Sequence, residues 1–150
     1  MPRSTVSIND VKPGMVLWAQ PGALMEADAL TSQTLGKARK DKHPLLVLSH
    51  DVTNEEVTVT YIASFSSSPD LKHLGLDESV KKVFIPVDPA TKEYDHAVVK
   101  WESNPNPTAC WIWGKSKMKL TGKEFKTFDD DKYFSKETAE KIDGLIHTTV

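Results

Sequence analysis

The stretch that decides the fold is PLLVLSHDVTNEEVTVTYIA, residues 44–63. Its first part, residues 44–49, is a short apolar run of the kind that forms a buried strand. Its last part, residues 57–63, alternates branched apolar residues with threonine, which is typical of a half-buried strand. The polar residues 54–56 between the two runs indicate a turn. The stretch therefore predicts a β-hairpin.

Further strand candidates flank this hairpin on both sides. Residues 11–14 (VKPG) predict a turn, and the apolar residues 15–19 follow it as an extended segment. Beyond the hairpin, three short apolar runs are separated by turns rich in Pro, Asp and Asn: residues 82–85, 97–101 and 109–113. Short strands at this spacing favour a barrel or a sandwich.

One helix is predicted near the C-terminus, from Ser135 to Ile146. Ser135 is a suitable N-cap, and Glu137 lies in the first turn, where the helix dipole stabilises a negative charge. Apolar residues at helical spacing then form one apolar face: Ala139, Ile142, Leu145 and Ile146. We expect this helix to pack on the strands through Ala139, Ile142 and Ile146.

The composition is that of an ordinary globular domain. Of the 150 residues, 39% are hydrophobic and 27% are charged, and the formal net charge is −2. A net charge this small argues against bulk electrostatic coating of nucleic acid, although it is compatible with a local basic patch. No segment has the apolar length of a signal-peptide core or of a membrane span. We expect a single domain, residues 1–150, in the cytoplasm.

The residues that usually hold metals are few and scattered. The one cysteine, Cys110, cannot form an internal disulfide and leaves a Cys-rich zinc site without ligands. None of the five histidines pairs with another His or a Cys at metal-ligand spacing. The acidic run 129–131 lacks the Gly and the terminal Glu of a calcium loop, and no Gly-rich phosphate-binding motif is present. We therefore expect neither a metal nor a cofactor.

The elements predicted in residues 11–18 and 42–64 follow one another in an order that can be compared with a known family. Residues 11–18 (VKPGMVLW) lead through a polar and basic loop into residues 42–49 (KHPLLVLS), and the next strand ends at Tyr61–Ser64. This order resembles the PemK/MazF toxins, in which a first strand, a basic loop, an Arg-Pro dipeptide and an apolar strand precede a strand that ends in Thr or Ser. The resemblance implies a mainly β fold, a small SH3-like and partly open barrel of five to seven strands with a C-terminal helix.

The same resemblance implies an activity and its residues. The family consists of metal-independent endoribonucleases that cut single-stranded RNA through a cyclic phosphate, which requires proton transfer and a donor to the phosphoryl oxygens. His43 stands where the family has Arg, and an imidazole can transfer protons because it titrates at about pH 6.5. Ser64 occupies the family's hydroxyl position. We expect His43 and Ser64 to be catalytic. The expected substrate-binding residues are Lys37, Arg39, Lys40, Lys42 and Ser66.

His43 in place of Arg keeps two classes of function open. The first is the endoribonuclease. The second is a non-catalytic SH3-like module that binds RNA or a protein partner, in which His43 only begins a strand and the charges of residues 37–42 belong to a solvated loop. The expected partners are single-stranded RNA and an antitoxin-like protein, and the resemblance also implies a homodimer.

The four tryptophans are expected to be core or interface anchors, because burying an indole stabilises strongly. Trp111 and Trp113 would share one face of a strand, with Ile112 on the other. One of these two faces is a candidate dimer surface.

Overall fold

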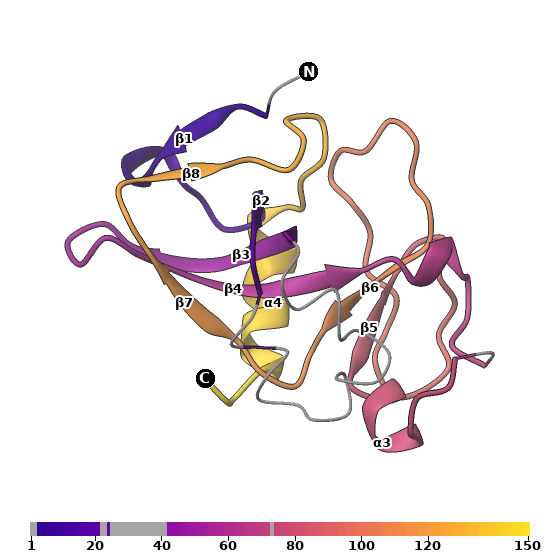
Figure 1. Cartoon of the computed structure of the whole chain (residues 1–150). Helices are drawn as coiled ribbons and strands as arrows, with labels where there is room; N and C mark the ends of the chain where they lie inside the picture. The colour runs from indigo at the N-terminus through magenta and orange to yellow at the C-terminus, as the bar shows by residue number, and fades with distance from the viewer. Residues whose placement is uncertain (1–2, 22–23, 25–41, 73) are drawn as a thin grey trace.

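The computed structural model describes residues 3–21, 24, 42–72 and 74–150. The strands in this part of the chain are β1 (Thr5–Ser7), β2 (Val16–Ala19), β3 (His43–Asp51), β4 (Glu56–Ala63), β5 (Phe84–Val87), β6 (Cys110–Trp113), β7 (Met118–Thr121) and β8 (Glu124–Lys126). The helices are α3 (Glu78–Lys81) and α4 (Lys136–Leu145), and the 3-10 turns are η1 (Ile8–Asp10) and η3 (Phe65–Ser67). The fold is mainly β with a C-terminal helix, as the sequence predicts (Figure 1).

The strands form one large antiparallel sheet and one small one. The large sheet has the order β2-β3-β4-β6-β5, with β7 also paired to β4, and the small sheet pairs β1 with β8. On one edge β4 pairs with β3, whereas its other edge is shared, because residues 56–59 pair with β7 and residues 62–63 pair with β6. Among the described strands the order ends at β2 and β5, which do not pair with each other, so the sheet does not close into a barrel.

The predicted hairpin is the centre of the large sheet. The register places Leu45 opposite Tyr61, and an irregularity between Val47 and Ser49 interrupts the ladder. At the turn, Glu55 has a positive φ of 53°, and the Asp51 carboxylate accepts hydrogen bonds from the backbone N and the Nδ2 of Asn54. These hydrogen bonds stabilise the charged carboxylate and lower the pKa of Asp51. The turn is therefore held by its own side chains.

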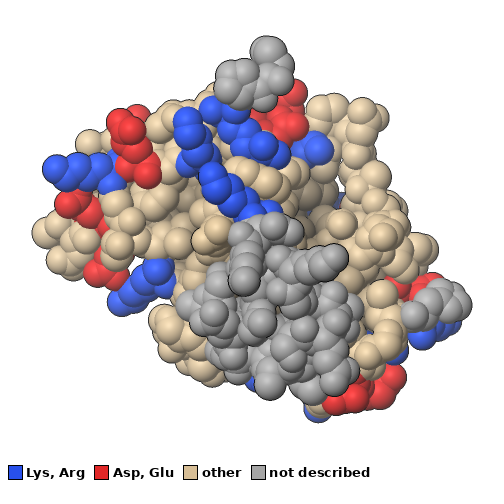
Figure 2. All heavy atoms as spheres, viewed as in Figure 1, with Lys and Arg blue, Asp and Glu red and all other residues tan. Residues whose placement is uncertain are grey.

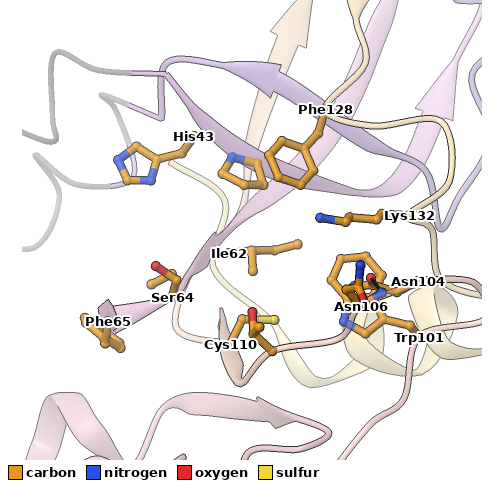
Figure 3. A pocket seen from close by; sticks show the side chains of 13 residues that line it. His43, Ile62, Ser64, Phe65, Trp101, Asn104, Asn106, Cys110, Phe128 and Lys132 are labelled. Atoms are coloured by element: carbon orange, nitrogen blue, oxygen red, sulfur yellow. Dashed lines mark hydrogen bonds between the residues drawn. The ribbon is translucent and has the colours of Figure 1, made fainter. Parts of the chain in front are cut away.

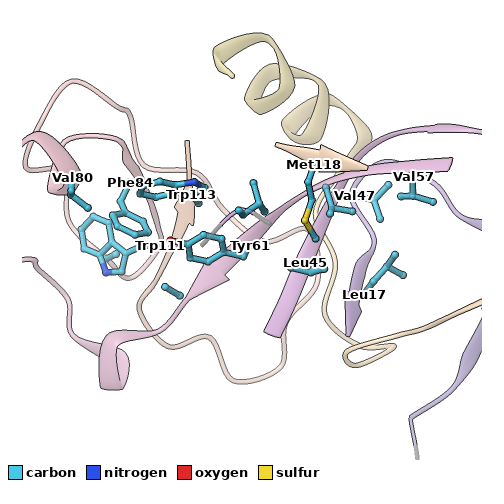
Figure 4. Packing of buried hydrophobic residues seen from close by; sticks show 14 of the residues in the cluster. Leu17, Leu45, Val47, Val57, Tyr61, Val80, Phe84, Trp111, Trp113 and Met118 are labelled. Carbon is cyan, nitrogen blue, oxygen red and sulfur yellow. The ribbon is translucent and has the colours of Figure 1, made fainter. Parts of the chain in front are cut away.

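Alternation along the strands divides the core into two faces. One face, here called the sealed core, is built on rings that are almost fully buried: Tyr61, Phe84, Trp111 and Trp113. Trp113 stacks on Tyr61 with a centroid distance of 5.5 Å and meets Phe84 at 5.0 Å. Figure 4 shows this packing, with α4 on the opposite side of the sheet.

The opposite face, here called the helix face, is covered by α4. Ser135 caps the helix as predicted, since its Oγ accepts a hydrogen bond of 3.1 Å from the backbone N of Thr138. Ala139, Ile142 and Ile146 are buried, which confirms the predicted packing residues. The prediction that Leu145 belongs to the apolar face is wrong, because Leu145 lies in the last turn of α4 and is 43% exposed. The helix packs on the sheet along a narrower stripe than the sequence pattern suggested.

Two further expectations are corrected. Residues 97–101 do not form a strand, because only Val99 pairs, through an isolated bridge to Val87. Its neighbour Val98 is 36% exposed, so an apolar run here does not mark a buried strand. Trp111 and Trp113 are both fully buried inside the chain, and so is Ile112, so neither face of β6 is available as a dimer surface.

Candidate functional site

A pocket of about 400 Å³ opens at one end of the helix face. Its floor is formed by Ile62 of β4 and Cys110 of β6, which also belong to the apolar cluster under α4. One side is formed by the start of β3 and the end of β4, and the other by the segments 101–108 and 128–132. Figure 3 shows these two sides facing each other across Ile62. The pocket thus brings together four segments that are far apart in the sequence.

The two predicted catalytic residues lie on the same side of this pocket. His43 is the first residue of β3 and is half-buried, with its ring edge-on to Tyr61 at a centroid distance of 6.4 Å. Ser64 directly follows β4 and is exposed. The antiparallel register brings the start of β3 to the end of β4, and both side chains line the pocket (Figure 3). The hairpin itself therefore places both side chains on one side of the pocket.

The other side carries residues that the sequence did not single out for function. Trp101 stacks on Phe134 at a centroid distance of 4.2 Å, which fixes the plane of its indole. Its Nε1 is buried and has no hydrogen-bond partner among the described residues. Asn104 lies on the same wall, and its Oδ1 accepts a hydrogen bond of 3.1 Å from the backbone N of Asn106. The polar groups on this side are therefore a buried indole N–H and a side-chain amide.

Aromatic rings and cations meet at the rim. Phe128 lines the pocket and stacks on Trp18 at 5.6 Å, while the guanidinium of Arg3 covers Trp18 at 4.0 Å from its ring centroid. The Lys132 ammonium lies 5.4 Å from the Phe128 ring centroid and points into the pocket (Figure 3). Lys132 also pairs with Asp129 at 4.0 Å. The rim therefore offers a ring surface together with a positive charge.

Cys110 supplies a neutral floor rather than a nucleophile. Burial raises the pKa of its thiol to about 12, against the opposing effect of the nearby Lys132 charge. The thiol therefore stays protonated at neutral pH, and only a thiolate is strongly nucleophilic. Proton transfer and nucleophilic attack in this pocket must come from other groups.

No protein-family model, curated protein or solved structure matches this chain. Within the described part of the chain, no cluster of three or more His, Cys, Asp or Glu side chains is arranged to hold a metal ion, and no helix has the length and apolar character of a membrane span.

The expected substrate-binding residues are not gathered at the pocket. Ser66 is exposed and is not part of the lining, because residues 65–67 have positive φ values of 45°, 58° and 61° and this turn directs Phe65 to the pocket instead. Lys42 is exposed beside His43 but does not line the cavity. The other three, Lys37, Arg39 and Lys40, lie outside the described residues.

The surface charge is mixed rather than uniformly basic. On the face seen in Figure 2, Lys and Arg side chains gather over β1 and β8, with Asp and Glu side chains close by. The acidic run near the pocket has internal partners, since Asp130 accepts hydrogen bonds from Ser4 and Thr127, and Asp129 accepts one from the backbone of Asp131. Of the described residues that line the pocket, Lys132 supplies the full positive charge.

Proposed function

We propose that this protein binds single-stranded RNA by taking one unstacked nucleotide into the pocket. The observation that carries the proposal is that His43 and Ser64, the two positions that resemble the catalytic positions of PemK/MazF toxins, line one cavity together with Phe65 and Phe128. Single-stranded RNA is typically bound by stacking splayed bases on aromatic side chains and by hydrogen bonds to their edges. The pocket has both elements, and Lys132 adds a charge for a phosphate.

The binding proposal is tested with a fluorescent single-stranded RNA whose anisotropy is followed at several salt concentrations. We expect Lys132→Met to weaken binding and to lower the slope of log K against log salt by about one unit, because one phosphate contact is lost. Lys141→Met is the matched control, since Lys141 is exposed on α4 and does not line the pocket. Equal behaviour of the two variants would contradict a role for the pocket.

The placement of His43 and Ser64 favours a second function, cleavage of the bound RNA. In this reaction His43 takes the proton of a ribose 2′-OH, the 2′-oxygen attacks the adjacent phosphorus, and the 5′-oxygen leaves with the proton that the His43 imidazolium returns. The Ser64 hydroxyl and the Lys132 ammonium donate to the phosphoryl oxygens as negative charge develops on them. The products are a 2′,3′-cyclic phosphate and a 5′-hydroxyl end, and no step requires a metal.

Cleavage is tested by identifying those two ends after incubation with RNA and a chelator. We expect His43→Ala to lower the rate about 10²- to 10⁴-fold while binding is retained, because a positioned acid or base contributes that much. His50→Ala is the control, since His50 is exposed at the other end of β3. RNA that is bound but never cut would identify a non-catalytic binding module. RNA that is neither bound nor cut would refute both functions.

A further inference from the structure

The wall formed by Trp101 and Asn104 contains an unmet hydrogen-bond donor. The indole Nε1 of Trp101 donates only, is closed off from solvent, and has no acceptor among the described residues. Buried polar groups in folded proteins nearly always have partners, so an isolated one calls for a specific explanation. The stack on Phe134 holds the indole in place, and Figure 3 shows Trp101 on the side of the pocket opposite His43 and Ser64.

Asn104 adds a second donor on the same wall. Its Oδ1 is already engaged by the backbone N of Asn106, and its Nδ2 makes no hydrogen bond within the described part of the chain. The bonded oxygen fixes which end of the amide is available, because the other end must be the NH₂ group. Trp101 and Asn104 therefore each keep an N–H group without a partner among the described residues.

We propose that this wall reads a guanine base. The rationale rests on the proposed binding of an unstacked RNA nucleotide. Guanine presents two adjacent acceptors, N7 and O6, whereas adenine presents N7 beside an amino group that donates. A wall of two donors pairs with guanine and leaves a donor facing a donor when adenine enters. Because Nε1 is closed off from solvent, the base reaches it only when neighbouring residues move, and residues 105–108 on this side of the pocket are all exposed.

The proposal is tested with guanosine and adenosine 5′-monophosphates, which have the same ring size and the same phosphate. We expect the wild-type protein to bind the guanine nucleotide roughly tenfold or more tightly than the adenine nucleotide, as for other two-donor readouts. Trp101→Phe keeps the ring on Phe134 and removes the N–H. It should cost the guanine nucleotide roughly tenfold in affinity and leave the adenine nucleotide almost unchanged.

A spectroscopic readout separates direct contact from a general loosening of the fold. The indole N–H signal of Trp101, assigned by its loss in Trp101→Phe, should shift when the guanine nucleotide is added. Trp111 and Trp113 serve as internal controls, because their Nε1 groups already donate to the Ser68 oxygen and the Ser116 hydroxyl at 3.2 Å. Their signals should stay in place.

The outcomes distinguish this inference from the function on which it rests. Nucleotides that bind with equal affinity, or a uridine nucleotide that binds better than the guanine one, would overturn the guanine assignment and leave RNA binding intact. An unmoved Trp101 signal at saturation would overturn the contact. If neither nucleotides nor single-stranded RNA bind, the proposed function fails and the inference fails with it.

Discussion

The same strands form both faces of the large sheet, but one face is the sealed core and the other carries α4 and the pocket. On β6, Trp113 belongs to the sealed core and its neighbour Ile112 to the helix face, while Cys110 forms part of the pocket floor. In the sealed core the indole N–H of Trp113 is satisfied inside the fold, by the Ser116 hydroxyl. At the pocket the indole N–H of Trp101 is not satisfied within the described residues. The two indole N–H groups thus differ in that one has its partner within the fold and the other has none among the described residues.

The largest expected difference between the two faces is in their contribution to stability. Trp113→Ala removes a fully buried indole that contacts both Tyr61 and Phe84, and should lower the free energy of unfolding by about 3–5 kcal/mol. Phe128→Ala, at the half-buried rim of the pocket, should cost only about 1 kcal/mol. Urea unfolding of both variants measures this contrast. Equal losses would show that the pocket is as much a part of the core as the sealed face.

The Cys110 thiol links the pocket floor to alkaline stability. Its pKa is raised by burial to about 12, from an ordinary value of 9.0, so the folded chain keeps a proton that the unfolded chain releases. The stabilising effect is therefore fully present below pH 9 and is lost as the pH rises toward 12, at up to about 1.4 kcal/mol per pH unit. Urea unfolding at pH 8 to 10.5 should show a shallower decline in Cys110→Ala. Parallel declines would mean that the thiol ionises freely in the folded protein.

A buried hydroxyl on β4 bonds to backbone oxygens at the end of β6 and just beyond it. The Oγ1 of Thr60 donates to the carbonyl oxygen of Trp113 at 2.6 Å, with the Ser116 oxygen at 3.2 Å. Thr60→Val keeps the shape but leaves these oxygens without that donor, and should cost about 1–3 kcal/mol in unfolding free energy. Thr58→Val on the same strand is the control, because Thr58 is only half-buried, and it should change stability by less than about 0.5 kcal/mol.

The smallest expected effect concerns α4, the helix that covers the helix face. Ser135→Ala removes the N-cap of α4 and should lower the unfolding free energy by about 1 kcal/mol, whereas Ser135→Asp should retain most of it because Asp also caps helices. Thermal unfolding followed by circular dichroism distinguishes the two. Neither change should alter nucleotide binding, since Ser135 does not line the pocket. Loss of binding in both variants would show that α4 shapes the pocket directly.

The sequence predicted the parts of the fold that depend on local pattern. The hairpin of β3 and β4 and the N-cap at Ser135 were found because apolar alternation and capping are local signals. β7 and β8 were missed, because the sequences MKLT and EFK place charges among single apolar residues. These strands exist because β4 and β1 provide partners for them, and a short window of sequence does not contain that information.

The same limit applies to the pocket. His43 and Ser64 were singled out because both lie in the hairpin segment whose order resembles a known family. Trp101, Asn104 and Lys132 were missed, since each lies in a turn-rich segment without a motif and joins the pocket only through tertiary packing. The stack of Trp101 on Phe134 is one such long-range contact. Local sequence patterns therefore identified the side of the pocket formed by β3 and β4. They did not identify the opposite side, formed by residues 101–108 and 128–132.

The shared edge of β4 has a consequence for how the chain is made. β3 and β4 are neighbours in sequence, but the strands that cover the other edge of β4 are β6 and β7, which end at Thr121. A growing chain at about 5–20 residues per second needs several seconds to add the roughly 60 residues between them. During that interval the unpaired backbone N–H and C=O groups along this edge of β4 are open to pairing with other nascent chains.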